Sequence, residues 1–283
     1  MEVLFMETLT RCATALGQAR RLLVLTGAGV SSESGMPTYR GPGGIYAANP
    51  SITAELSAEG LVNDPDRVWE HIDAMRIQAK AAEPNSVHRT LAQWEQSGRF
   101  ERFLIATQNI DGLHQRAGSQ RVTELHGSLW QIARPRTVDF TEDEQFSQDT
   151  QDMEEPEERE NVLRRWSEEN QQQIWENRTV PFSSIPPYRD PEVRPNVVLF
   201  NEGYGSRLVW VEDFIRGAPD AVLVIGCSGG VTLLARLLDR CRAAMPDGVI
   251  ININPHEDCI EISHEYLPMK ASTALAAIDS RWA

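Results

Sequence analysis

The sequence has few cysteines and no long apolar run, and both shortages narrow the class of protein. Four cysteines stand far apart in 283 residues, and no two form a Cys-x-x-Cys pair. This spacing suggests neither a disulfide framework nor a cysteine zinc site. No apolar stretch reaches the roughly 18 residues of a membrane-spanning helix, and the first residues lack the basic and apolar regions of a secretion signal. We therefore expect a soluble, cytoplasmic protein without a membrane partner.

Basic residues are also scarce. Lysine and arginine number 27 against 41 aspartates and glutamates, which gives a net charge of -14. This charge argues against a nucleic-acid surface and is compatible with cationic partners such as lysine-bearing peptides, although most acidic proteins are simply soluble.

Much of the acidity is concentrated in one segment, residues 141–170, which carries 12 acidic side chains against 3 arginines. We expect an acidic helix over residues 157–177, in a solvated insertion or a dedicated binding element. Its apolar positions would be Val162, Leu163, Trp166, Ile174 and Trp175.

Short apolar runs alternate with helical patterns along the chain. The apolar runs cover residues 22–25, 103–106, 197–200, 221–225 and 249–253. Helical periodicity covers residues 7–20, 67–81, 87–96, 208–216 and 231–244. Runs that are apolar on both faces are typical of parallel strands covered by helices. The alternation therefore predicts an α/β fold with a doubly wound, Rossmann-like parallel sheet.

Two segments do not fit a simple alternation. Residues 41–101 are too long for one crossover helix, so we expect a small helical module there, at one edge of the sheet. Residues 129–193 contain the acidic stretch and form a second expected insertion. The Rossmann-like main domain would then consist of residues 1–40, 102–128 and 194–283.

Polar and glycine-rich residues follow two of the predicted strands. Gly27 and Gly29 come directly after residues 22–25, in a turn whose bare backbone N–H groups can hold a pyrophosphate. Gln108, Asn109 and Asp111 follow the second run, and His126 comes soon after. These positions predict a dinucleotide site with a base beside it.

Five motifs in order resemble those of the sirtuins, the NAD-dependent protein deacylases. They are Gly35-Met-Pro-Thr-Tyr-Arg40-Gly, Thr107-Gln-Asn-Ile-Asp-Gly-Leu-His114, Glu124-Leu-His-Gly127, Arg194-Pro-Asn-Val-Val-Leu-Phe200-Asn-Glu202 and Gly226-Cys-Ser228. The resemblance covers about residues 8–278, except for residues 129–193. It implies NAD as the cofactor and an acylated lysine-containing protein or peptide as the partner.

The resemblance also implies roles for individual residues. His126 would be the catalytic base, and Asn109 and Asp111 would hold nicotinamide and its ribose. Further implied NAD contacts are Gly27, Ala28, Gly29, Ser31, Tyr39, Arg40, Gln108, Ile110, Gly226, Cys227, Ser228 and Asn252. The implied substrate-binding residues are Val197, Val198 and Phe200, on a strand to which an extended peptide would pair.

Two further positions indicate which kind of acyl group the chain would accept. Sirtuins that remove succinyl or malonyl groups carry a Tyr-x-x-Arg pair on the helix before Glu-Pro-Asn, and here Ile72 and Met75 occupy those places. Both are apolar, which favours uncharged acyl groups. Arg76 is one position off and points about 100° away from Met75 on a helix, so we do not expect it to substitute.

The chain departs from the usual sirtuin pattern in its metal site. Common sirtuins carry two Cys-x-x-Cys pairs after the catalytic histidine, whereas residues 128–193 contain neither cysteine nor histidine. We therefore expect no structural zinc. Smaller departures are Tyr39 in place of phenylalanine, Cys227 in place of threonine, and Asn201 in place of a glycine, which could crowd the peptide groove.

The implied activity is NAD-dependent deacylation of protein lysines, which releases nicotinamide, free lysine and O-acyl-ADP-ribose. Two alternatives use the same NAD site. The chain could send the ADP-ribosyl group to water or to a protein side chain, as an NAD hydrolase or ADP-ribosyltransferase, or it could be a non-enzymatic sensor of NAD or ADP-ribose. The set of Asn109, Asp111 and His126 speaks against a sensor, which needs no base.

Overall fold

A parallel sheet forms the main layer of the computed structural model, which describes residues 2–39, 44–133, 174–176, 193–228, 232–256 and 263–282. Within these residues the sheet has six strands in the order β3-β2-β1-β7-β8-β9. They are β1 (Arg21–Thr26), β2 (Arg102–Thr107), β3 (Val122–Glu124), β7 (Ala221–Ile225), β8 (Val249–Ile253) and β9 (Glu265–Leu267). All neighbours run parallel. This is the strand order of dinucleotide-binding sheets, so the predicted fold class is confirmed.

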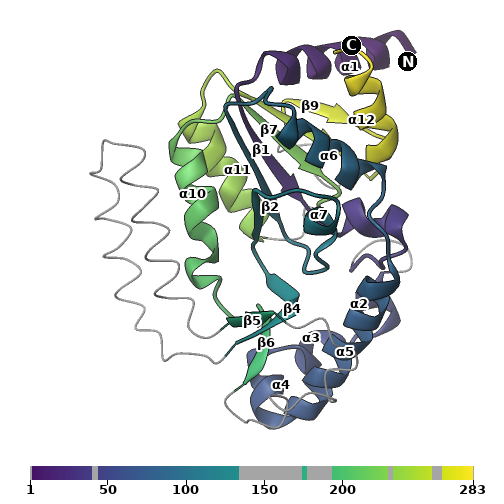
Figure 1. The fold of residues 1–283 in the computed structure, drawn as a ribbon, viewed down its shortest axis with the longest axis vertical. Helices are drawn as coiled ribbons and strands as arrows, with labels where there is room; N and C mark the ends of the chain where they lie inside the picture. The colour runs from purple at the N-terminus through teal and green to yellow at the C-terminus, as the bar shows by residue number, and fades with distance from the viewer. Residues whose placement is uncertain are drawn as a thin grey trace.

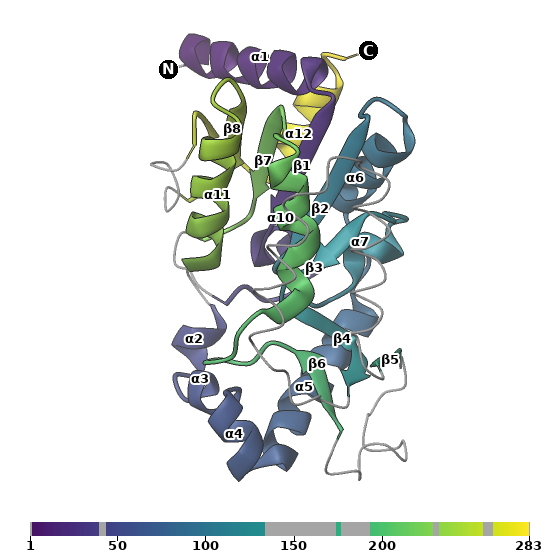
Figure 2. The ribbon, with the colours of Figure 1, turned by 90° about the vertical axis from the view of Figure 1, so that its left-hand side faces the viewer.

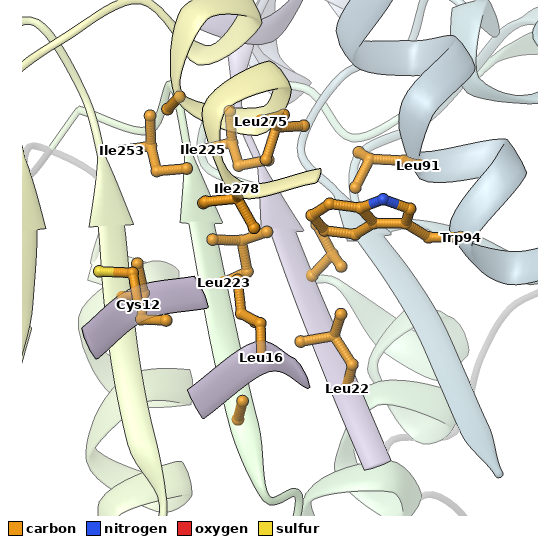
Figure 3. Packing of buried hydrophobic residues seen from close by; sticks show 14 of the residues in the cluster. Cys12, Leu16, Leu22, Leu91, Trp94, Leu223, Ile225, Ile253, Leu275 and Ile278 are labelled. Carbon is orange, nitrogen blue, oxygen red and sulfur yellow. The ribbon is translucent and has the colours of Figure 1, made fainter. Parts of the chain in front are cut away.

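Helices cover both faces of this sheet (Figures 1 and 2). One face carries α1 (Glu2–Gln18), α6 (Ser86–Gln96) and α12 (Ala271–Asp279), and the other carries α10 (Val209–Arg216) and α11 (Thr232–Ala244). Successive strand side chains point to opposite faces, so Leu22 packs under the first group of helices and Leu23 under the second. Figure 3 shows Leu16, Trp94 and Ile278 of the first group gathered around strand residues such as Leu223.

A smaller module lies below the carboxyl ends of the main strands in Figure 1. It contains α2 (Ile45–Ala48), α3 (Ile52–Glu55), α4 (Ala58–Asn63) and α5 (Pro65–Ala81), together with an antiparallel sheet. That sheet has the order β5-β4-β6, with β5 at Ile174–Glu176, β4 at Gly127–Ala133 and β6 at Arg194–Val197. A separate apolar core joins Trp69 and Ile72 of α5 to Leu129 and Ile132 of β4.

The short elements of the main domain are η1 (Ala28–Ser34), α7 (Leu113–Arg116) and η4 (Gly205–Leu208). In the described part of the chain, no helix is both long and apolar enough to span a membrane.

Two expectations about secondary structure are wrong. Residues 197–200 do not form a strand of the main sheet, because β6 (Arg194–Val197) pairs antiparallel with β4 and Val197 packs into the module's core. The helix expected to reach residue 177 is a strand at its end, where β5 (Ile174–Glu176) pairs with β4. The other residues expected in that helix, Val162, Leu163 and Trp166 among them, lie outside the described residues.

Candidate active site

The candidate site lies where β1 and β7 end side by side. The chain leaves β1 toward β2 and β3, and it later returns to place β7 on the other side of β1. In a doubly wound sheet this is the point where the loops diverge and ligands bind. A cavity of about 690 Å³ opens here and extends from the glycine turn to α5 of the small module.

The two turns after β1 and β7 touch through glycine backbones. The Gly29 N–H donates to the Gly226 carbonyl at 3.0 Å. A Cβ atom on Gly29 would lie 2.7 Å from the Gly226 Cα, and one on Gly27 would lie 2.8 Å from the Gly226 carbonyl oxygen. No side chain fits at either place, so the cavity wall here is bare backbone. Such a wall suits close approach by a diphosphate.

A buried hydrogen-bond network stands behind that wall. The Ser31 hydroxyl donates to Asp111 Oδ2 at 2.7 Å, and Asn109 Nδ2 donates to Ser31 Oγ at 3.0 Å and to the Gly27 carbonyl at 3.1 Å. The Leu113 N–H donates to Asp111 Oδ1 at 2.9 Å. Burial raises the pKa of Asp111, and the bonds from Leu113 and Ser31 oppose that rise. The network fixes the Asn109 amide at the cavity.

His126 lies between β3 and β4 and lines the same cavity. Its Nδ1 is 2.7 Å from the Gln108 carbonyl. Because a carbonyl only accepts, Nδ1 carries the proton and Nε2 of the neutral ring keeps its lone pair. Burial lowers the pKa of His126, the bond to Gln108 opposes this shift, and the charge of Arg207 adds to it. The geometry thus supplies a neutral imidazole that can accept a proton at Nε2.

The other end of the cavity is apolar. Ile72 and Met75 of α5 line it. Arg76 is absent from the lining. It is fully buried, its guanidinium lies 5.3 Å from the centre of the Trp130 ring, and it donates to the Leu129 carbonyl. The expectation that Arg76 points away from Met75 therefore agrees with its position.

The segment after β6 has little backbone capacity left for a peptide. The N–H groups of Val198 and Phe200 donate to the carbonyls of His126 and Leu56, each at 2.9 Å. The Leu199 N–H donates to the Glu202 carboxylate at 2.8 Å. The side chains nevertheless line the cavity, as do those of Val197 and Asn201. Asn201 has φ of 68°, a conformation natural to glycine and tolerated by asparagine, which explains how it replaces glycine here.

Most of the residues singled out from the sequence come together at this cavity. Those lining it are Gly27, Ala28, Gly29, Tyr39, Ile72, Met75, Gln108, Asn109, Ile110, His126, Val197, Val198, Phe200, Gly226, Cys227 and Ser228. Ser31, Asp111 and Asn252 are buried behind the lining. Arg40 lies outside the described residues. Burial raises the pKa of the Tyr39 phenol to about 12, so its ring is a neutral wall.

Several lining residues were missed. Asn254 lies just past the end of β8, where it reaches the cavity and donates through Nδ2 to the Cys227 carbonyl at 2.8 Å. Its place in Ile-Asn-Ile-Asn, two residues after Asn252 and just past the apolar run, was the available signal for a polar side chain at the strand end. Other missed residues are Glu33 of η1, Tyr46 of α2, Leu56, Tyr204, His256 and Lys270, for which no motif gave a signal. Glu202 also lines the cavity, and it ends one of the motifs although no role was assigned to it.

Among the described residues, no group of three or more His, Cys, Asp or Glu side chains could hold a metal ion.

Known proteins resemble this chain over nearly its whole length. The Sir2 family model matches residues 27–232. An NAD-dependent protein deacylase of Aquifex aeolicus is 32% identical over 263 residues, which cover 91% of this chain and 93% of the relative. A Sir2 homologue mutant solved with ADP-ribose has a TM-score of 0.76 at 26% identity, covering 96% of this chain and 95% of the other. A Sir2 homologue solved with NAD has a TM-score of 0.72 at 26% identity, covering 97% and 95%. With its sheet order, its cavity and its relatives in agreement, the chain belongs to the Sir2 family.

Proposed function

We propose that this Sir2-family chain is an NAD-dependent protein-lysine deacylase that transfers the acyl group of a modified lysine to ADP-ribose and releases nicotinamide. One observation carries the proposal. A neutral histidine with a free Nε2 shares one cavity with a glycine backbone cradle and an apolar end. The deacylase activity named for the Aquifex aeolicus relative supports it.

The cradle fits NAD, as the ligands of the related structures would suggest. Gly27, Ala28 and Gly29 would hold the diphosphate on one side, and Gly226, Cys227 and Ser228 on the other. Asn254 would meet the adenosine ribose, with Asn252 behind it. Arg40 and Tyr39 would help to enclose the bound dinucleotide. When bound, NAD supplies nicotinamide as the leaving group and the ribose carbon that accepts the acyl oxygen.

The polar residues of the cavity would then have separate roles in orienting NAD and in accepting a proton. Asn109 would orient the nicotinamide ribose, and Asp111 would act through Ser31 and through the loop that holds Ile110. Gln108 fixes the proton of His126 on Nδ1, so Nε2 is the atom that takes the proton from a ribose hydroxyl. Positioning of this kind supplies much of the rate enhancement in a reaction that needs no strong protein nucleophile.

An acyl-lysine peptide would contact Val197, Val198 and Phe200 mainly through their side chains, because the neighbouring N–H groups are already engaged. Ile72 and Met75 would meet the acyl chain. An apolar wall gains about 0.8 kcal/mol for each buried methylene, whereas a buried carboxylate without a cation costs several kcal/mol. Uncharged acyl groups are therefore the proposed substrates.

The acyl preference can be measured with acetyl-, butyryl- and succinyl-lysine forms of one peptide. We expect a higher kcat/KM for both uncharged forms than for the succinyl form. The double variant Ile72→Tyr with Met75→Arg should raise the succinyl value while lowering the butyryl value. A wild-type protein that prefers succinyl-lysine would refute the assignment of Ile72 and Met75 to the acyl end.

We propose that the chain works without a structural zinc ion. The segment that carries zinc ligands in common sirtuins has no cysteine or histidine here. Elemental analysis of the purified protein should give well under one zinc per chain, and a strong chelator should leave activity unchanged. Stoichiometric zinc that is lost together with activity would show that other side chains had rebuilt the site.

A cytoplasmic location belongs to the proposal as well. In the described part of the chain Cys12, Cys227 and Cys241 are buried thiols that form no disulfide, which suits a reducing compartment.

Nicotinamide release separates the proposal from its alternatives. The protein is given NAD with and without an acetyl-lysine peptide. A deacylase releases nicotinamide only when the peptide is present. Equal release without the peptide would indicate an NAD hydrolase or an ADP-ribosyltransferase, and NAD binding without any release would indicate a sensor.

A further inference from the structure

The ring of Tyr204 stacks with the imidazole of the candidate base, although none of the sequence motifs pointed to Tyr204. Its ring and the imidazole of His126 are stacked, with centroids 5.6 Å apart and planes inclined by 26°. Tyr204 comes from the loop after β6, whereas His126 comes from the turn between β3 and β4. Both side chains line the cavity. The stack therefore brings two segments that are distant in the sequence together at the His126 imidazole, the proposed base.

The loop that carries Tyr204 is braced on both sides. Before it, the Glu202 carboxylate pairs with both terminal nitrogens of Arg194 and accepts the Leu199 N–H. After it, the Arg207 N–H donates to the Tyr204 carbonyl and the Arg207 guanidinium donates to Asn196 Oδ1. These bonds tie the loop to β6 and its flanks, so the ring is presented from a fixed backbone.

The hydrogen bond from His126 Nδ1 to the Gln108 carbonyl still leaves the imidazole ring free to tilt. A single hydrogen bond fixes the direction of Nδ1 but allows the ring plane to tilt about that contact. A flat ring against one face of the imidazole removes the tilt, and stacked aromatic pairs at this separation are favourable. Resting on the proposed function, we propose that Tyr204 is a positioning residue that holds the His126 ring plane and keeps Nε2 directed at the bound substrate.

The pKa of His126 would report a loss of the Tyr204 ring, because it depends on burial and on the charges nearby. Arg207 faces His126 and disfavours its protonation, while Glu124 and Glu202 face Arg207 and moderate its charge. Burial raises the pKa of the Tyr204 phenol, so the ring is neutral near neutral pH. Without the ring, water would reach the imidazole and stabilise its protonated form. The pKa of His126 would then rise toward its ordinary value.

The matched variants are Tyr204→Leu, which removes the aromatic face, and Tyr204→Phe, which keeps it without the hydroxyl. For Tyr204→Leu we expect kcat to fall by about tenfold, as for a misplaced catalytic group, with the KM for NAD nearly unchanged. The acid limb of its pH profile should move to higher pH, because the base must be neutral. Tyr204→Phe should match the wild-type protein in all three respects. A Phe variant that loses as much as the Leu variant would overturn the role of the ring.

A titration of the histidines by NMR tests the same claim without using activity. The chain has 6 histidines, and the signal of His126 is identified by its loss in His126→Gln. The pKa of His126 should be higher in Tyr204→Leu than in the wild-type protein and unchanged in Tyr204→Phe. Equal values in all three would refute the proposal. Tyr204→Met replaces Tyr204→Leu if that variant does not fold. If the wild-type protein shows no deacylation, the proposed function fails while this titration still decides the role of Tyr204.

Discussion

His126 is held as a neutral base by contacts that the sequence does not show. Its motif identifies it, but the tautomer follows from the Gln108 carbonyl and the lowered pKa follows from burial. Activity needs the neutral ring. Because the pKa in the folded protein lies below the ordinary value of about 6.5, activity should persist below pH 6.5 and fall only as the pH passes the folded value.

Removal of this base gives the first prediction. His126→Ala should lower deacylation by roughly 10²-fold or more, since general-base catalysis contributes at least that much, and should leave NAD binding nearly intact. Steady-state kinetics and calorimetric binding of NAD check the two parts. His264→Ala is the control, because His264 is exposed and precedes β9, at the opposite end of the strands from the cavity. Near wild-type turnover in His126→Ala would remove His126 from the mechanism.

Other residues show how far sequence reasoning reached. Gln108, Asn109 and the glycines belong to local motifs at strand ends, so their gathering at the cavity could be predicted. Tyr204 could not be identified, because its position depends on how the loop after β6 lies in space. For Asn201, the sequence shows that a glycine is replaced, but only the structure shows that the backbone keeps a positive φ at this position.

At the scale of elements, the long buried strands and helices were predictable and the short ones were not. Strands β1, β7 and β8 are apolar on both faces, which the sequence shows directly. Strands β3 and β9 have only three residues each, too few to give a pattern. The apolar residues near Val197 looked like a strand of the main sheet, but the core that they enter belongs to the small module.

Strand β4 braces the loop after β2. The Leu129 N–H donates to the Ile110 carbonyl at 2.9 Å, and the Trp130 indole N–H donates to the Asp111 carbonyl at 2.7 Å. Gly112 lies so close to this indole that a Cβ atom would be 2.8 Å from Trp130 Nε1. The small module therefore holds the backbone of the residues proposed to contact nicotinamide.

Trp130→Phe keeps an aromatic ring and removes this donor. We expect the KM for NAD to rise several-fold and the free energy of unfolding to fall by about 1–3 kcal/mol, because a buried acceptor is left without its partner. Kinetics and urea denaturation measure both effects. Trp94→Phe is a matched control, since it removes the indole bond to Asp279 at 3.0 Å on the far helices. It should cost stability without changing the KM, and equal KM effects in the two variants would contradict the bracing role.

For the whole molecule, the strand alternation predicts the class of fold but not how the two parts share the site. The Rossmann-like sheet supplies the glycine turns and Asn109, while α5 of the small module supplies Ile72 and Met75. Such a juxtaposition follows from the tertiary contacts between sheet and module. The segment expected to be acidic and inserted is mostly outside the described residues, and its role stays a prediction.

Two buried histidines make the stability of the whole fold depend on pH. The rings of His88 on α6 and His114 on α7 lie 4.8 Å apart. Burial lowers the pKa of His88 to about 4, and it lowers that of His114 well below the ordinary value. Below about pH 6.5 these two histidines therefore become protonated in the unfolded chain but stay neutral in the folded chain. The free energy of unfolding consequently falls as the pH falls.

His88→Gln tests this dependence. The wild-type protein should lose stability between pH 7 and pH 5, by up to roughly 1.4 kcal/mol per pH unit for each buried histidine. The variant should lose less, since glutamine does not titrate and can still accept the Asn85 N–H in the capping box that His88 completes. Urea denaturation at both pH values measures the difference, with His264→Gln as the control. The same pH dependence in His88→Gln and the wild-type protein would exclude His88 as its source.

The central claim is that the acyl group of a lysine passes to ADP-ribose at this cavity. Its most direct test uses an acetyl-lysine peptide with an isotope-labelled acetyl group, NAD and the wild-type protein, with mass spectrometry of all products over several turnovers. We predict equal amounts of nicotinamide, deacetylated peptide and ADP-ribose carrying the labelled acetyl group, and roughly 10²-fold slower formation of the last two products in His126→Ala. Free ADP-ribose formed while the peptide keeps its label would contradict the claim.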